Sequence, residues 1–145
     1  MVLTKHQQQI LNAEICPYCG CSTKEVTEMD VYGRVYRDRK IIACQNFPNC
    51  DAYVGCHADE TAMGRLANKR LRGFKNSAHK YFDKIWMENL IERSELYQDL
   101  STFLKLPKEL THIGMFQEHT CKRVIAWSIS YYYKIKYQKL INNKN

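Results

Sequence analysis

Four cysteines in the first third of the chain are spaced as two pairs, and this spacing constrains the fold more than any other feature. Cys16 and Cys19 flank a Pro-Tyr dipeptide, whereas five residues separate Cys44 from Cys50. A close pair of thiolates can bind one metal ion while the backbone turns, and four thiolates provide the tetrahedral coordination of a structural Zn²⁺. The sequence therefore predicts one zinc ion with four ligands, namely Cys16, Cys19, Cys44 and Cys50.

The predicted zinc site is structural, because four protein ligands leave no coordination position open for a substrate. The 24 residues between Cys19 and Cys44 are enough for two or three short strands. A β module of this size buries too little apolar surface to be stable alone, and a structural zinc ion contributes on the order of 10 kcal/mol of folding free energy. The alternative is that the four cysteines are buried thiols without a metal.

The remaining composition indicates a reducing compartment. Seven cysteines are an odd number, and their close pairing favours metal ligation over a disulfide framework. The polar sequence MVLTKHQQQ is unlike a signal peptide, and no apolar run approaches the ~20 residues of a membrane-spanning helix. We therefore expect a cytoplasmic protein with no membrane partner.

The first 60 residues have the pattern of a short helix followed by strands. A helix capped by Thr4 is expected over residues 4–13. Residues 24–45 alternate as in strands, with a turn at 37–40 and with Val31, Val35 and Ile41 as β-branched positions. The composition changes near residues 58–62. We therefore predict three segments: an N-terminal helix or tail at 1–13, a zinc ribbon at 14–58 and a basic helical module at 60–145.

Helical periodicity dominates the second half of the chain. Apolar residues recur at helical spacing over 63–87, and a second helix is expected from Ser94, as its N-cap, to just before Pro107. The last helix is expected over 117–141, with an inner face of Cys121, Val124, Ile125, Tyr132 and Ile135. The predicted fold class is α+β, in which a small zinc ribbon of short antiparallel strands packs against three or so helices.

The charge is distributed unevenly along the chain. Residues 1–60 hold 6 Lys/Arg against 8 Asp/Glu, whereas residues 61–145 hold 16 against 7. Two blocks, 65–80 and 119–145, each contain six basic residues and no acidic residue. Separate basic blocks favour a polyanionic partner such as nucleic acid, although ordinary solvated helix faces are the alternative explanation.

The expected nucleic-acid surface lies on two of the predicted helices. On the first helix, the basic side chains that share the face opposite the apolar one are Arg65, Lys69, Arg72 and Lys80. On the last helix, a second group falls within about 80° of arc, with Tyr133 nearby: Arg123, Trp127, Lys134 and Tyr137. Lys136, on the same helix, is expected to extend the positive face together with Arg123 and Lys134. Aromatic residues among cations can stack on the bases of RNA or single-stranded DNA. The alternative is that this helix packs against another subunit or protein.

Other cysteines and histidines have weaker patterns. A second metal site would need scattered donors, namely His6, Cys21, Cys56 and His57, whereas metal ligands normally come in local pairs. We expect Cys56 and Cys121 to be small buried residues and His57 to pack at the junction of the modules. His79 and Asp83, four residues apart, and His112 are candidates for acid/base chemistry, but the pair has the spacing of an ordinary helix-surface interaction.

The second cysteine pair resembles a known ribbon. CQNFPNC is similar to the Cys-x-x-Tyr/Phe-Pro-x-Cys element of the C-terminal zinc ribbons of bacterial type I topoisomerases, and CPYCG resembles their first cysteine pair. Those ribbons contact single-stranded DNA. The resemblance covers residues 16–50 and implies a zinc-ribbon fold with a contact to nucleic acid.

A broader resemblance extends from residue 16 to about residue 125. Its motifs are CPYCG, VYGRVY, CDAYVGCH, GRLANKRLRGFKNSAHKYFDKIW, and HIGMF followed by Cys121. In this order they resemble the zinc-finger-containing family of unknown function found in bacteriophages and bacteria. The resemblance implies a mobile-element protein with a zinc site, and it implies no particular reaction.

These observations together favour a binding protein over an enzyme. We expect a non-enzymatic zinc-ribbon protein of phage or mobile-element origin that binds RNA or single-stranded DNA through its basic helices. The alternative is a protein-binding module or inhibitor that acts on a host nucleic-acid-handling or defence complex. A nuclease is less favoured, because the sequence contains no converging carboxylates and no open zinc site.

Overall fold

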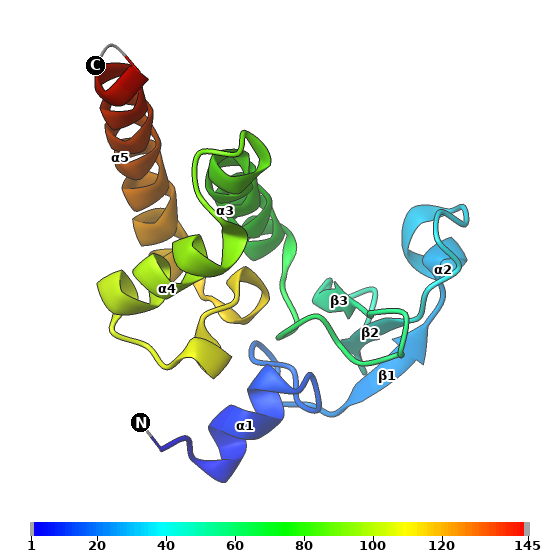
Figure 1. Cartoon of the computed structure of the whole chain (residues 1–145). Coiled ribbons are helices and arrows are strands. Elements are labelled where there is room, and N and C mark those ends of the chain that lie inside the picture. The colour runs from blue at the N-terminus through cyan, green and yellow to red at the C-terminus, as the bar shows by residue number, and fades with distance from the viewer. Residues whose placement is uncertain (1, 144–145) are drawn as a thin grey trace. The chain divides into compact units, whose positions relative to one another are not determined.

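The computed structural model describes residues 2–143 and contains both helices and strands, as the sequence predicts (Figure 1). The elements follow in the order α1 (Lys5–Leu11), β1 (Thr23–Val26), α2 (Glu28–Tyr32), β2 (Ile41–Cys44), β3 (Tyr53–Gly55), α3 (Lys69–Met87), α4 (Arg93–Leu104), η1 (Lys108–Leu110), η2 (Ile113–Met115) and α5 (Glu118–Asn143). Packing divides the chain into two compact units, Met1–Arg72 and Gly73–Asn145. None of the described helices is long and apolar enough to cross a bilayer.

Helix α1 begins where the sequence predicts it. The Thr4 side chain accepts a hydrogen bond from the Gln7 backbone N–H, and the Gln7 side chain accepts one from the Thr4 N–H. This reciprocal capping box satisfies two backbone donors that a helix start leaves unpaired. The predicted cap at Thr4 is therefore confirmed.

The three strands form an antiparallel sheet in the order β1-β2-β3. Thr23 pairs with Cys44, and Ile41 pairs with Gly55. The central strand β2 is the most buried of the three, and its Ile41, Ala43 and Cys44 side chains are all inaccessible to solvent or nearly so. This sheet places the third predicted ligand, Cys44, at the end of its central strand.

The segment between β1 and β2 differs from the predicted run of strands. Residues 28–32 form the short helix α2, which begins with a capping box between Thr27 and Asp30 and ends at Gly33 in the left-handed conformation. Val31 therefore lies in a helix and Val35 in an exposed loop. The strand prediction was wrong here because a Thr-x-x-Asp cap and a terminal glycine are local helix signals that outweigh β-branched composition.

The core of the first unit is small and includes the metal centre. Its buried cluster is Ala13, Cys16, Cys44, Ala52 and Leu66, with Cys21, Ile42, Cys50, Val54 and Ala62 packed against it. Few large apolar side chains are present, so this unit buries little apolar surface for its length. The fold therefore depends on what the cysteines bind.

Helix α3 starts six residues later than predicted. Residues 61–67 run in irregular and extended backbone, where Ala62 bridges Cys56, and Ala67 exchanges two backbone hydrogen bonds with Tyr53 at 3.0 and 3.1 Å. The Asn68 side chain then accepts the Leu71 N–H at 2.9 Å and caps the helix. The prediction of a start at Met63 was wrong because the backbone of Ala67 is already paired with β3.

The second unit is helical, and aromatic side chains join its helices. The ring of Phe82 on α3 lies 4.9 Å from the ring of Tyr97 on α4 and 6.4 Å from the ring of Trp127 on α5. Its most buried large residues are Phe82, Ile85, Leu96, Leu100, Ile113 and Val124. The N-cap position of α4 is Glu92 rather than Ser94, and its side chain makes no capping hydrogen bond. Of the predicted inner residues of α5, Cys121, Val124 and Tyr132 are buried, whereas Ile125 and Ile135 are half-buried.

Candidate metal centre

The first pair of predicted ligands lies in a tight turn between α1 and β1. The Cys16 N–H donates to the Cys21 carbonyl at 2.8 Å, and the Gly20 N–H donates to the Cys16 carbonyl at 2.9 Å. Gly20 has φ 72°, which only glycine adopts without a steric penalty. The turn therefore brings the side chains of Cys16 and Cys19 to the same side.

The second pair lies at the end of β2 and in the turn that follows. The Phe47 N–H donates to the Cys44 carbonyl at 2.9 Å, and the Cys50 N–H donates to the Asn46 carbonyl at 3.1 Å. The Asn46 N–H points at the Cys44 sulfur at 3.4 Å. A backbone N–H that donates to a cysteine sulfur stabilises the negative charge of its thiolate. The five residues between Cys44 and Cys50 therefore form a turn that can present both cysteines to a metal ion, and we call this turn and the one at Cys16 and Cys19 the ligand turns.

The four sulfur atoms are grouped as a tetrahedral metal site requires. All four Sγ atoms lie within 4.8 Å of one another, and the Sγ atoms of Cys16 and Cys50 are 3.8 Å apart. Zn–S bonds of ~2.3 Å at tetrahedral angles give S···S separations of about 3.8 Å. The residues present therefore fit a bound Zn²⁺, and the structure brings together all four of the predicted ligands.

The surroundings of the four thiols differ. Cys16 and Cys44 are fully buried, Cys50 is half-buried and Cys19 is exposed. The hydrogen bond with Cys50 raises the pKa of Cys19 to about 12. Burial raises the pKa of Cys50, but the Ala52 N–H and the neighbouring thiols outweigh it and lower the pKa overall. The first thiolate to form in this group is therefore stabilised by hydrogen bonds from the neighbouring thiols.

A bound Zn²⁺ in this site would cross-link the chain. Cys16 and Cys19 would hold the turn after α1, and Cys44 and Cys50 would hold the end of β2 and the turn beyond it. Four thiolates complete the coordination of the ion, so the centre supports the fold and offers no open position for a reacting group.

The other cysteines lie elsewhere. Cys56 and Cys121 are buried, as expected of small apolar residues, and burial raises the pKa of both. Cys21 accepts a contact from the Asn46 side-chain amide at 3.5 Å. Among residues 2–143, no second group of three or more metal-binding side chains occurs. The expected packing of His57 was wrong, because its side chain is exposed.

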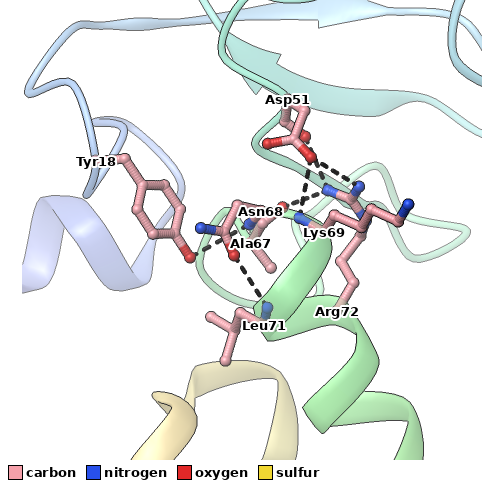
Figure 2. Close-up of polar contacts among 7 residues, drawn as sticks. All are labelled: Tyr18, Asp51, Ala67, Asn68, Lys69, Leu71 and Arg72. Atoms are coloured by element: carbon pink, nitrogen blue, oxygen red, sulfur yellow. Dashed lines mark hydrogen bonds and ion pairs between the residues drawn. The ribbon is translucent and has the colours of Figure 1, made fainter.

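The two ligand turns also hold the start of α3 (Figure 2). Tyr18, between the first two ligands, accepts the Asn68 N–H on its hydroxyl at 3.2 Å. Asp51, directly after the last ligand, accepts the Lys69 N–H at 3.0 Å. Negative charge at a helix N-terminus is stabilising, so Asp51 stabilises the first turn of α3, which belongs to the first unit.

Arg72 makes structural contacts, and its predicted contact with nucleic acid stays a prediction. Its guanidinium donates to the carbonyls of Asp51 and Ala67 at 2.8 and 2.6 Å and pairs with the Asp51 carboxylate at 3.3 Å. It also lies 4.0 Å from the centre of the Tyr53 ring. Because the planar guanidinium donates several hydrogen bonds at once, Arg72 on α3 is joined to the segment that contains β3. In the sequence, the only signal for this pairing is the position of Asp51 next to the predicted ligand Cys50.

Arg65 was also expected on the basic face of the first long helix, and this position was wrong. It precedes α3, and burial lowers the pKa of its partly buried side chain. Lys69 and Lys80 do lie on α3, and both side chains are exposed.

The predicted group on α5 is divided by the structure. Trp127 was placed opposite the core, but it is half-buried between Phe103 and Tyr131, with ring centroids 5.7 and 4.7 Å away. The position was wrong because the rings of Phe103 on α4 and Phe82 on α3 both pack against Trp127. The remaining members of the group are exposed: Arg123, Lys134, Lys136 and Tyr137. Arg123 lies 5.0 Å from the centre of the Phe103 ring.

The candidate acid/base pair is an interaction along one helix. His79 Nδ1 and Asp83 Oδ2 are 3.1 Å apart, and Asp83 also accepts the Trp86 indole N–H at 3.0 Å. The pair lines an open depression of about 500 Å³ over α3. His112 lies beside Tyr97, with ring centroids 6.3 Å apart. No contact between His112 and the pair is found within the described residues.

Comparison with known families agrees with this geometry. The model of a family described as a zinc-finger-containing domain matches residues 12–131, a range that includes all four grouped cysteines. No curated protein and no solved structure matches the chain significantly. Because the match spans most of the chain, the protein belongs to the family of zinc-finger-containing domains.

Proposed function

We propose that this is a non-enzymatic nucleic-acid-binding protein of phage or mobile-element origin. In this proposal the zinc centre stabilises the first unit, and exposed cations of the helices contact the phosphates of RNA or single-stranded DNA. Phosphate contacts of this kind give affinity without sequence specificity.

The observation that carries the proposal is a set of exposed cations without neutralising partners. Lys69, Lys80 and Arg123 are exposed, and within residues 2–143 none of them has a carboxylate at salt-bridge distance. Residues 61–145 as a whole carry 16 basic and 7 acidic side chains. Uncompensated positive charge attracts a polyanion and releases its counterions on binding.

One aromatic side chain adds to this set. Phe103 is 37% exposed and lies under the Arg123 guanidinium. The exposed part of a ring beside a cation can contact an unpaired base, which favours single strands over duplexes. Phe103 was not among the predicted residues, because its neighbour in space, Arg123, is distant in sequence.

The proposal assigns no catalytic step. The four-thiolate donor set is closed, and the Asp83 carboxylate is already shared between His79 and Trp86. Labelled RNA and single-stranded DNA should therefore stay intact with Mg²⁺, Mn²⁺ or Zn²⁺. Cleavage that disappears in His79→Ala would contradict this part of the proposal.

Salt dependence of binding is the direct test. Neutralising three phosphates of a single strand gives a slope of about −2 for log K against log salt, or about 20-fold weaker binding at 200 mM than at 50 mM salt. Fluorescence anisotropy with a labelled oligonucleotide measures this slope. A flat salt response rejects the proposal.

Charge reversal locates the contacts. The double variant Lys80→Glu/Arg123→Glu should weaken binding and reduce the salt slope by about 1.4, since each cation lost removes about 0.7. Lys5→Glu on α1 is the control for charge, because Lys5 is also exposed but lies in the acidic part of the chain. An equal loss of affinity in Lys5→Glu and in the double variant would show that the net charge of the protein, and not these two positions, determines binding.

A further inference from the structure

Helix α5 has an outer apolar face in addition to the one that it buries. Its buried side chains end at Tyr132, and from Tyr133 to Asn143 no described side chain is buried. In Figure 1 these C-terminal turns extend past α3 and α4. Isolated helical turns of this length are marginally stable in water, so a contact on their exposed side would stabilise them.

The exposed apolar residues of α5 form one stripe. They are Ile129, Tyr133, Tyr137, Leu140 and Ile141, with exposed fractions of 39, 66, 65, 55 and 42%. At 3.6 residues per turn, these positions fall within about 120° of arc, on the side opposite Val124 and Ser128. We call this set the outer stripe. A contiguous apolar row of this kind on a soluble helix marks an interaction site.

Basic residues flank the outer stripe on both sides. Lys134 lies along one edge and Lys136 along the other, and both are exposed. No acidic residue occurs between His119 and Asn143. Two copies of the stripe facing each other would therefore bring lysine against lysine, which disfavours self-pairing.

We propose that the outer stripe binds an amphipathic helix of a partner protein, whose apolar side packs on the stripe and whose flanking carboxylates pair with Lys134 and Lys136. When one helix binds another, apolar side chains three or four residues apart make the main contacts, as they would in the outer stripe. Ile129, Leu140 and Ile141 are aliphatic, and aliphatic side chains offer no ring on which bases stack, so the composition favours a protein over nucleic acid. This inference is independent of the proposed nucleic-acid contacts at Lys80 and Arg123.

The test uses a designed probe and the full zinc-loaded chain. The probe is a fluorescent peptide of about three heptads with Leu and Ile at the a and d positions and Glu at the flanking e and g positions. A second peptide carries Lys in place of Glu. We expect the acidic peptide to bind in an anisotropy titration and the lysine peptide to bind at least about tenfold more weakly.

Two substitutions on α5 locate the contact. Leu140→Gln should weaken binding of the acidic peptide about tenfold, with helicity checked by circular dichroism. Met87→Gln is the matched control, because it removes an apolar side chain that is 65% exposed on α3, outside the stripe. Lys134→Glu should weaken the acidic peptide and strengthen the lysine peptide, a reversal that general damage to the fold would not produce.

Three results would overturn the inference. The first is no binding of the acidic peptide, and the second is equal loss in Leu140→Gln and Met87→Gln. The third is that the outer stripe binds something else while the acidic peptide stays unbound. In that case Leu140→Gln would lose either affinity for an oligonucleotide or self-association of the chain. Failure of the nucleic-acid proposal would instead appear as a flat salt response with peptide binding intact.

Discussion

The carboxylate of Glu28 holds the loop between α2 and β2. It is buried and accepts the backbone N–H groups of Tyr36, Arg37 and Arg39. The bond from the Tyr36 N–H is the largest of the effects that lower the pKa of Glu28. Because the folded pKa is below the unfolded one, this stabilisation is complete above the ordinary glutamate pKa and is lost as the pH falls through the lowered value.

Glu28→Gln should loosen this loop. A neutral amide has one acceptor oxygen in place of two and lacks the charge that strengthens the bonds. The protection factors for hydrogen exchange at the amides of Tyr36, Arg37 and Arg39 should fall, and acidification of the wild type should lower the same protection factors. Glu25→Gln is the control, because the exposed Glu25 carboxylate pairs with the exposed Lys40 ammonium group at 3.5 Å. Unchanged protection in Glu28→Gln would contradict this role.

The two buried cysteines Cys44 and Cys56 lie close in sequence to each other, but only Cys44 belongs to the sulfur group. Elemental analysis should therefore return one zinc ion per chain. Cys50→Ser should lose the ion and unfold the first unit, since a ligand is removed. Cys56→Ser should retain it. Two zinc ions per chain, or loss of zinc in Cys56→Ser alone, would contradict the assignment.

At the scale of elements, the start of α3 is determined by its contacts with the ligand turns. Asn68 caps the helix with its own side chain, and Asp51 and Tyr18 bind the N–H groups of Lys69 and Asn68 (Figure 2). The first turn of the helix therefore belongs to the zinc-binding unit, while most of its length packs in the second unit.

Asn68→Ala should lower the free energy of unfolding by about 1 kcal/mol, the usual cost of removing an N-cap side chain. Asn68→Asp keeps the acceptor oxygen and adds charge at a helix N-terminus, so it should be close to wild type. Urea denaturation with zinc in excess measures both variants. A loss in Asn68→Asp equal to that in Asn68→Ala would show that the cap is not the cause.

At the scale of the whole molecule, each of the two units has its own source of stability. The first unit is built around sulfur atoms and small side chains, whereas the second buries large aromatic and aliphatic residues. Both tryptophans, Trp86 and Trp127, lie in the second unit. Their fluorescence therefore reports on the second unit alone.

Removal of zinc by a chelator should unfold the first unit and leave the second intact. Amides of β1, β2 and β3 should lose protection, while the tryptophan emission and most of the helical circular dichroism should stay unchanged. The physical reason is that the metal cross-links only the first unit, within which all four sulfur atoms lie. A red shift of the tryptophan emission on chelation would contradict this independence.

The features that the sequence predicted correctly are those set by local chemistry. The four grouped cysteines, the cap at Thr4 and the core face of α5 follow from spacing and periodicity. Helix α2 also had a local signal, the Thr27–Asp30 cap, which the alternation of valines obscured. Whether residues 14–58 fold as a separate domain stays a prediction.

The sequence by itself determined which four cysteines come together, because two close cysteine pairs with turn-forming residues between them have the spacing of a four-thiolate metal site. Only the tertiary structure decided which contacts the cations and the aromatic residues make. Arg72 pairs with Asp51, and Trp127 packs on Phe103, through contacts between segments far apart in the chain. Periodicity tells which side of a helix a residue occupies, but what covers that side depends on packing, which no local pattern encodes.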